Sequence, residues 1–210
     1  MVDKISGDEY YAALAELDCP SALEGRVTRE HYSADPTPLA ITDHVPIDMP
    51  STHVAVKAEG YAITVDTKGK LNWETGMLDH QPLLCILSEQ VSRQYLEMLR
   101  AKNISWIAVG KDAIDLPKAM EILGERFGVE RLALLGGGHI NGAFLHAGLI
   151  DELSLLLAPG VDGRRGQTAL FDGIADMDSE PVSLALRSVK RMDNDVLWLR
   201  YLMRKEQLDL

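Results

Sequence analysis

Short apolar runs alternate with helical patterns along the middle of the chain. Three runs are almost entirely apolar, as in buried strands of a parallel sheet: Leu83–Leu87, Ile104–Val109 and Arg131–Leu135. Between them, apolar residues recur at helical spacing from Ser88 to Arg100 and again after Asp115. Asp115 is a good N-cap, and Pro117 suits a first helical turn. This alternation predicts a parallel sheet with right-handed crossovers.

The flanking segments extend this pattern and then change it. Strands are predicted at His53–Ala58, Tyr61–Asp66 and Leu153–Ala158, with a helix from about Ile140 to Ala147. Near the end, Val182–Lys190 and Val196–Met203 flank a polar turn at residues 191–195, which indicates an antiparallel hairpin. The expected fold is therefore α/β, with a mostly parallel central sheet flanked by helices and a C-terminal antiparallel hairpin.

One long segment shows neither the helical nor the strand periodicity of apolar residues. Ser33–Ser51 contains prolines at positions 36, 38, 46 and 50, so we expect extended, irregular backbone. A connection of this length is often functional. Too little chain precedes it to form a separate core, so residues 1–210 are expected to form a single domain.

Composition narrows the function classes. The 210 residues carry a formal net charge of −11, which argues against a broad nucleic-acid or anionic-membrane surface. No apolar stretch approaches the roughly 20 residues of a membrane span, and Met1–Glu9 does not resemble a signal peptide. Cys19 and Cys85 match no metal or disulfide spacing, and the histidines show no ligand spacing either. We therefore expect a cytoplasmic protein with reduced thiols and no metal.

The most informative segment runs from Leu132 to Leu145. An apolar strand enters Gly136-Gly137-Gly138, and His139 and Ile140 begin a helix. Glycines let phosphate oxygens approach the backbone, and a helix N-terminus supplies unpaired N–H groups with a partial positive charge. The segment is neither a P-loop nor a regular G-x-G-x-x-G, because no Lys-Ser/Thr follows and Asn141 occupies the last position. It predicts phosphate or nucleotide binding; the alternative is a tight turn without a ligand.

A second candidate lies near the N-terminus, at Gly25-Arg26-Val27-Thr28. Thr28 is a potential N-cap for a short helix from about Arg29, which would place Arg26 beside a helix N-terminus. There Arg26 could bind a phosphate in bidentate fashion. The alternative is an ordinary surface arginine.

In combination these motifs resemble the C-terminal reductase domain of bifunctional riboflavin-biosynthesis proteins, which has the dihydrofolate reductase-like fold. The resemblance covers roughly Tyr10 to Met203. Its most specific part is the glycine cluster followed by Gly148-Leu149-Ile150-Asp151-Glu152-Leu153 and Ala158-Pro159. Weaker matches occur in the expected order, at residues 25–28, 66–71, 87–88 and 109–111.

The resemblance implies an NADPH-dependent reductase of a small pyrimidine-like or pterin-like substrate, acting as a homodimer. It implies that Gly136, Gly137, Gly138, His139 and Ile140 hold the diphosphate of NADPH. It places Gly25, Arg26 and Thr28 on the adenosine side, where Arg26 or a neighbour favours the 2′-phosphate. Ser88 and Glu89 would lie along the adenosine ribose and its phosphate. No proton donor is assigned; Asp43, His44, Asp79 and His80 are candidates that are also ordinary loop residues.

Two departures from the family pattern bear on catalysis. Family members usually begin with a strand carrying Ser-Leu/Val-Asp-Gly, which lines the substrate pocket, and nothing in Met1–Tyr10 matches it. Without that strand, we expect an open position inside the sheet and an incomplete pocket. Leu135 also stands where the family often has Glu. The alternative function is therefore a non-catalytic or truncated relative that binds a nucleotide or forms a dimer.

Overall fold

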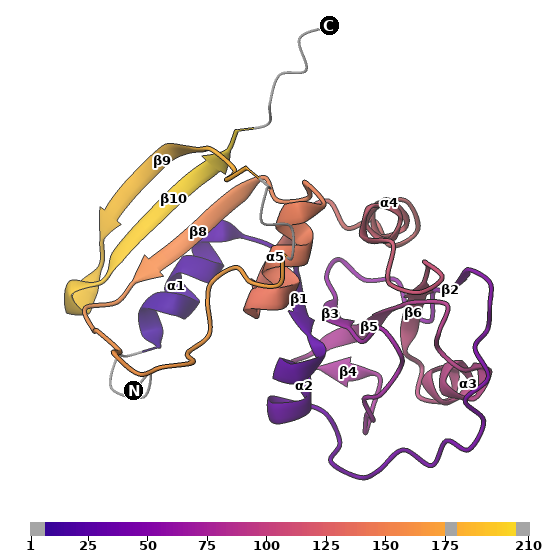
Figure 1. Cartoon of the computed structure of the whole chain (residues 1–210). Helices are drawn as coiled ribbons and strands as arrows, with labels where there is room; N and C mark the ends of the chain where they lie inside the picture. The colour runs from indigo at the N-terminus through magenta and orange to yellow at the C-terminus, as the bar shows by residue number, and fades with distance from the viewer. Residues whose placement is uncertain (1–6, 175–179, 205–210) are drawn as a thin grey trace, which may run out of the picture.

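The computed structural model describes residues 7–174 and 180–204. It contains two sheets that lie side by side, with helices around them (Figure 1). The helices are α1 (Asp8–Leu17), α2 (Arg26–Tyr32), α3 (Arg93–Ala101), α4 (Leu116–Phe127) and α5 (Gly138–His146). The strands of the larger sheet are β1 (Ser21–Gly25), β2 (Ser51–His53), β3 (Ala62–Val65), β4 (Met77–Leu78), β5 (Gln81–Leu87), β6 (Ser105–Ala108) and β7 (Leu132–Gly136). The smaller sheet contains β8 (Glu152–Leu157), β9 (Leu184–Arg191) and β10 (Leu197–Met203).

The larger sheet is parallel through its centre. Its order is β2-β6-β5-β3-β1-β7, and the five strands from β6 to β7 run in one direction. Only β2, on the β6 edge, and the short β4 are antiparallel. The carboxyl ends of the five parallel strands consequently meet at one edge of the sheet.

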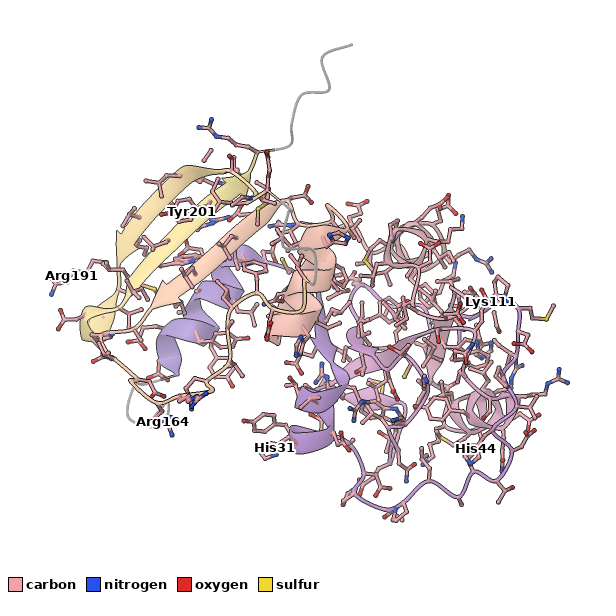
Figure 2. All side chains as sticks on the ribbon, viewed as in Figure 1. His31, His44, Lys111, Arg164, Arg191 and Tyr201 are labelled. Atoms are coloured by element: carbon pink, nitrogen blue, oxygen red, sulfur yellow. The ribbon has the colours of Figure 1, made fainter. Side chains whose placement is uncertain are left out.

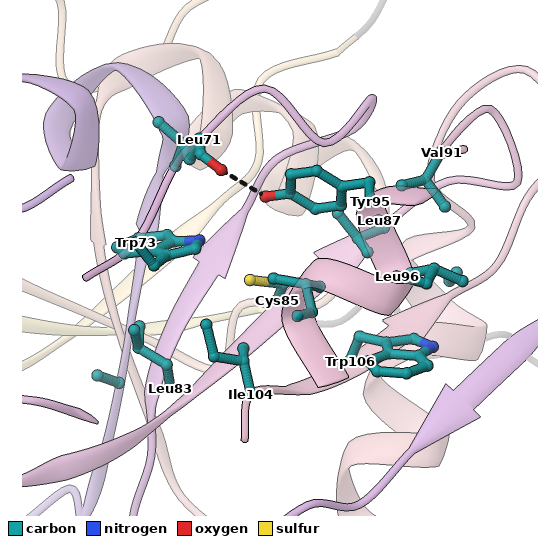
Figure 3. Packing of buried hydrophobic residues seen from close by; sticks show 13 residues of the cluster. Leu71, Trp73, Leu83, Cys85, Leu87, Val91, Tyr95, Leu96, Ile104 and Trp106 are labelled. Atoms are coloured by element: carbon teal, nitrogen blue, oxygen red, sulfur yellow. Dashed lines mark hydrogen bonds between the residues drawn. The ribbon is translucent and has the colours of Figure 1, made fainter. Parts of the chain in front are cut away.

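Alternate residues of the central strands enter two cores, one on each face. On one face, Cys85 and Leu87 pack with Tyr95, Leu99 and other residues under α3 (Figure 3). On the other face, residues such as Leu84 and Ile86 pack with Leu123 and Phe127 of α4 and with Phe144 of α5. The central strands β3, β5 and β6 are buried on both faces, which explains why their sequences are continuous apolar runs.

The smaller sheet is antiparallel, in the order β8-β10-β9. Helix α1 lies beside it (Figure 1), and Glu16 on α1 pairs with Lys190 on β9 at 2.8 Å. Trp198 of β10 is buried, and its indole Nε1 donates to Ser154 Oγ on β8. The predicted C-terminal hairpin is therefore confirmed, but it forms a sheet with β8 instead of extending the parallel one.

Most predicted elements are confirmed to within a few residues, including the Asp115 cap, whose carboxylate accepts from Lys118 N at 3.0 Å. Three predictions are wrong. The strand expected at His53–Ala58 is only Ser51–His53. The helix expected from Ser88 begins at Arg93, because Ser92 Oγ caps it by accepting from Tyr95 N. Thr28 is not an N-cap, as described below.

The proline-rich segment Ser33–Ser51 is irregular, as expected, up to Ser51, where β2 begins. Its apolar side chains, including Leu39, Ile41 and Ile47, pack against the core beside α3. The Gln94 side chain of α3 also accepts from Thr42 N and Asp43 N. In this structure the segment therefore covers a core.

Candidate functional site

The candidate site is the edge at which the five parallel strands end. Ligands of open α/β sheets bind outside the carboxyl ends of the strands. Here β1 ends in Gly25, β5 is followed by Ser88 and Glu89, and β7 ends in Gly136. All ten residues predicted to bind the cofactor therefore lie along one edge, although they are up to 115 positions apart in the sequence. The fold brings the predicted site together.

The junction between β7 and α5 leaves a helix N-terminus without a side-chain cap. Gly137 is the N-cap residue, and no side chain of residues 7–174 or 180–204 caps the first amides of the nine-residue helix. The first N–H groups of a helix have no partner within the helix, so those at this end point outward with a partial positive charge. This arrangement suits the oxygens of a phosphate.

The three glycines of this junction differ in why glycine is present at each position. Gly136 has φ +95°, and a Cβ there would lie 3.1 Å from Asn141 Nδ2. A Cβ on Gly138 would lie 2.5 Å from the carbonyl oxygen of Ala169. A Cβ on Gly137 would meet none of the described residues within 4 Å. Gly136 and Gly138 are therefore required by the chain itself, whereas Gly137 faces open space.

A later segment of the chain crosses α5 next to this junction. Asp172 N donates to Gly138 O at 3.0 Å, and Asn141 Nδ2 donates to Leu170 O at 2.9 Å. The segment comes so close that a Cβ on Gly142 would lie 1.9 Å from Asp172 O. It thus covers one side of α5 while leaving the space above Gly137 open.

The second predicted motif lies on the neighbouring strand. Gly25 ends β1 and is the N-cap of α2, so Thr28 lies in the first turn instead of capping it. The physical reason is that β1 runs directly into α2 without a loop. A Cβ on Gly25 would lie 3.2 Å from Ile140 Cγ1, so this glycine permits close contact between the β1–α2 and β7–α5 junctions.

The two arginines of α2 have different surroundings. Arg29 is buried, with its Nε 3.1 Å from Glu24 Oε2, and burial lowers its pKa. The Arg26 side chain is 36% exposed and forms an ion pair with Glu30 within α2. Arg26 is consequently the arginine that a ligand at this edge could reach.

Asp66 organises the turn after β3. Its Oδ2 accepts from Lys70 N at 2.6 Å, from Leu71 N at 2.8 Å and from the Tyr95 hydroxyl at 3.3 Å. Burial raises the pKa of this carboxyl, although the hydrogen bonds and the charge of Arg26 oppose the shift. The bonds hold a turn whose exposed residues, Lys68 and Lys70, are both basic. The match at residues 66–71 marked this turn, but no feature of the sequence indicated the role of Asp66.

Ser88 and Glu89 mainly connect neighbouring strand ends. Ser88 is fully buried, and its Oγ donates to Thr67 O at 2.8 Å. Glu89 Oε1 accepts from Gly110 N at 3.0 Å, and Glu89 N donates to Gly110 O. Both lie at the predicted place, but their side chains serve the protein's own loops here.

Two further polar side chains, His139 and Arg164, lie at the surface. His139 is at the start of α5, with its Nε2 3.9 Å from Asp172 Oδ2. Arg164 pairs with Asp162 at 2.6 Å on a loop beside the smaller sheet, across the molecule from Lys111 at the end of β6 (Figure 2). The loop residues considered as proton donors are all exposed: Asp43, His44, Asp79 and His80.

An apolar hollow separates the two sheets. It has a volume of about 800 Å³ and is lined by residues of β7 and β8, together with side chains of α1, α4 and α5. The strands β7 and β8, each at an edge of its own sheet, form two of its walls.

Within residues 7–174 and 180–204, no three His, Cys, Asp or Glu side chains lie close enough together to hold a metal ion. None of the helices in the described part of the chain combines the length and apolar character needed to cross a membrane.

Known proteins resemble this chain in sequence and in fold. The sequence profile described as the RibD C-terminal domain matches residues 41–198. The chain is 29% identical over 199 residues to the 2,5-diamino-6-ribosylamino-4(3H)-pyrimidinone 5′-phosphate reductase of Methanothermobacter thermautotrophicus, covering 92% of this chain and 86% of that protein.

Solved structures share the fold at low sequence identity. A pyrimidine reductase-like protein of Corynebacterium diphtheriae has a TM-score of 0.67 at 17% identity, covering 95% of this chain and 82% of that one. A riboflavin biosynthesis reductase of Saccharomyces cerevisiae has a TM-score of 0.56 at 14% identity, covering 94% and 80%. The mixed α/β fold predicted from the sequence is thus confirmed as that of these reductases.

Proposed function

Because the chain belongs to the family of the RibD C-terminal domain, we propose that it is an NADPH-dependent reductase of a phosphorylated pyrimidine. The named function of its relative supports a pyrimidine substrate and reduction as the reaction. The observation that carries the proposal is the open, uncapped junction at Gly137.

The residues of the carboxyl edge fit a dinucleotide. The amides of Gly137, Gly138, His139 and Ile140 would hold the diphosphate, since a Cβ on Gly137 would meet no described residue within 4 Å. Bound NADPH would supply the hydride, and the protein would orient it and exclude water. The chain has a net charge of −11, but the binding groups at this site are backbone amides. A doubly negative diphosphate would therefore contact hydrogen-bond donors locally, despite the overall negative charge of the protein.

Arg26 is the proposed contact for the 2′-phosphate. It is the accessible arginine on α2, whereas the charge of Arg29 is paired with that of Glu24. If Arg26 released Glu30 and bound a phosphate, it would exchange one ion pair for a bidentate contact with a doubly charged group. Gly25, Thr28 and Glu89 would line the adenosine side without a direct charge contact, while Ser88, which is fully buried, would hold the loop behind them.

The direct test follows NADPH absorbance at 340 nm with 2,5-diamino-6-ribosylamino-4(3H)-pyrimidinone 5′-phosphate as substrate. We expect oxidation that depends on the substrate. A protein that binds NADPH but never oxidises it would instead support the second candidate, a non-catalytic nucleotide-binding relative.

We also propose that the protein is a cytoplasmic homodimer. Several apolar side chains of the smaller sheet are exposed, among them Leu157 at 53%, Leu186 at 58% and Val189 at 54%. Grouped exposure of this kind is typical of an interface. Light scattering after size exclusion should give about twice the 23.2 kDa mass of the chain, and a monomeric mass would refute the dimer.

A further inference from the structure

We propose that Thr64, Asp66 and Trp73 form an internal binding site for one water molecule, in the core between β3 and α3. The proposed cofactor cradle is elsewhere, at the start of α5. The inference concerns the interior of the protein and does not depend on whether the protein reduces a pyrimidine.

The first observation is that three buried polar atoms have no hydrogen-bond partner among the described residues. They are Thr64 Oγ1, Asp66 Oδ1 and Trp73 Nε1. The three residues are only 0%, 1% and 2% exposed, so bulk solvent does not reach these atoms. A buried polar atom that stays unpaired destabilises the folded state, and native proteins therefore pair such atoms with protein groups or with internal water.

The second observation is that the three atoms lie around one side chain, that of Cys85. Thr64 is directly opposite Cys85 in the parallel register of β3 and β5, and Asp66, two residues later, points to the same face. The indole nitrogen of Trp73 is on the side of its ring that faces Cys85 (Figure 3). Burial raises the pKa of the Cys85 thiol, the charge of Asp66 raises it further, and the Trp73 N–H opposes the shift. Both groups are therefore close to the sulfur, and the thiol between them stays neutral.

The third observation is that the nearby hydroxyl and thiol groups do not supply the missing bonds. The one hydroxyl proton of Tyr95 is directed at Leu71 O, at 2.9 Å, and at Asp66 Oδ2, at 3.3 Å (Figure 3). It is therefore not available to Asp66 Oδ1 or to Thr64. The Cys85 thiol is a weak donor and a weak acceptor, and it bonds to neither of them.

The three atoms determine the chemistry of the ligand. The Trp73 indole nitrogen is only a donor, so a metal ion would be opposed by its N–H group. The Asp66 carboxylate is negatively charged and only accepts, so it would repel an anion. A water molecule can accept from the indole, donate to Asp66 Oδ1 and bond to the Thr64 hydroxyl. It would then have three hydrogen bonds, the usual number for a buried water molecule.

The bound water would complete the support of the turn after β3. One carboxylate oxygen of Asp66 already holds this turn, by accepting from Lys70 N and Leu71 N. The water would hold the other oxygen and so fix the whole carboxylate. Because the turn carries Lys68 and Lys70 at the carboxyl edge of the sheet, the position of these two cations would depend on a hydrogen bond in the interior.

The test measures nuclear Overhauser transfer from water to the indole N–H protons of the ¹⁵N-labelled full chain. The three tryptophans form a matched set, because each is 2% exposed. Trp106 Nε1 donates to Ser51 Oγ at 3.0 Å, and Trp198 Nε1 donates to Ser154 Oγ at 2.8 Å. We expect a water cross-peak at Trp73 and none at the other two. Equal cross-peaks at all three would show transfer relayed by hydroxyl protons, and that result, or no cross-peak at Trp73, would overturn the proposal.

Thr64→Val provides a second arm, because valine has a similar shape and lacks the hydroxyl. If the hydroxyl were simply unpaired, its removal should raise the melting temperature. If it binds the water, we expect a fall of about 2–4 °C, the shift for one lost hydrogen bond in a chain of this size, together with loss of the Trp73 cross-peak. Thr64→Ser retains the hydroxyl and should retain the cross-peak. A higher melting temperature in Thr64→Val, or a Trp73 cross-peak that persists in it, would contradict the site.

Discussion

Gly137 allows the cofactor proposal to be tested with little effect on the fold. A Cβ at this position would meet no described residue other than its chain neighbours within 4 Å, and the residue has φ −73°, which any amino acid can adopt. Leucine there would extend into the open space in which we place the diphosphate. Gly137→Leu should therefore block NADPH while leaving the protein folded.

The expected magnitude follows from linkage. At a free NADPH concentration of 100 times Kd, binding stabilises the folded state by about 2.7 kcal/mol. For a domain of this size, that corresponds to a rise in melting temperature of roughly 5–11 °C. In Gly137→Leu this rise should disappear. The melting temperature without ligand should fall by no more than about 4 °C, since losing glycine at an N-cap costs at most about 1 kcal/mol.

The matched control is Gly163→Leu. Gly163 also has open space around its Cβ position, but it lies on a loop far from the junction in sequence. It should keep the full NADPH-induced rise. Undiminished protection in Gly137→Leu would refute the reasoning, because the diphosphate would then bind elsewhere.

Four further predictions concern the surrounding structure. Gly142→Ala should lower the melting temperature clearly, because its Cβ would lie 1.9 Å from Asp172 O; unchanged unfolding would contradict the contact. Leu99→Ala should cost about 2–5 kcal/mol in denaturant unfolding, since Leu99 is fully buried under α3. Arg26→Ala should weaken NADPH more than NADH in calorimetry, and equal losses would remove Arg26 from the 2′-phosphate site. Burial raises the pKa of Glu152, but Arg200 and Arg187 outweigh this effect and hold the pKa below its usual value. The stabilisation from these ion pairs is therefore present above about pH 4.3 and lost as the pH falls further. Glu152→Gln should be less stable than the parent protein in urea unfolding at pH 7, and the two stabilities should converge in acid.

The apolar runs predicted the central strands because a strand buried on both faces must be apolar along its length. The same signal failed for β1, whose Ser-Ala-Leu-Glu-Gly sequence is short and includes a glutamate. That glutamate is tolerated because Arg29 pairs with it. A pairing between a strand and the following helix does not appear in hydrophobic periodicity.

The glycine cluster was visible in the sequence, but the reasons for its individual glycines were not. Gly138 and Gly142 are required by a segment about 30 residues later, and nothing local to the motif indicates that contact. Likewise, Ser88 and Glu89 were placed at the correct edge of the sheet, whereas their bonds to Thr67 and Gly110 depend on the pairing of strands. Local motifs indicated the site, and tertiary contacts decided which of its atoms remain accessible.

The most direct measurement is an NMR titration of the ¹⁵N-labelled protein with NADPH, following the backbone amides of Gly137, Gly138, His139 and Ile140. If these amides hold the diphosphate, their signals should move the most and saturate together, and inorganic diphosphate should move the same set at higher concentration. If NADPH leaves these four signals in place, or shifts a different part of the molecule, the dinucleotide does not bind at the start of α5 and the proposed function loses its basis.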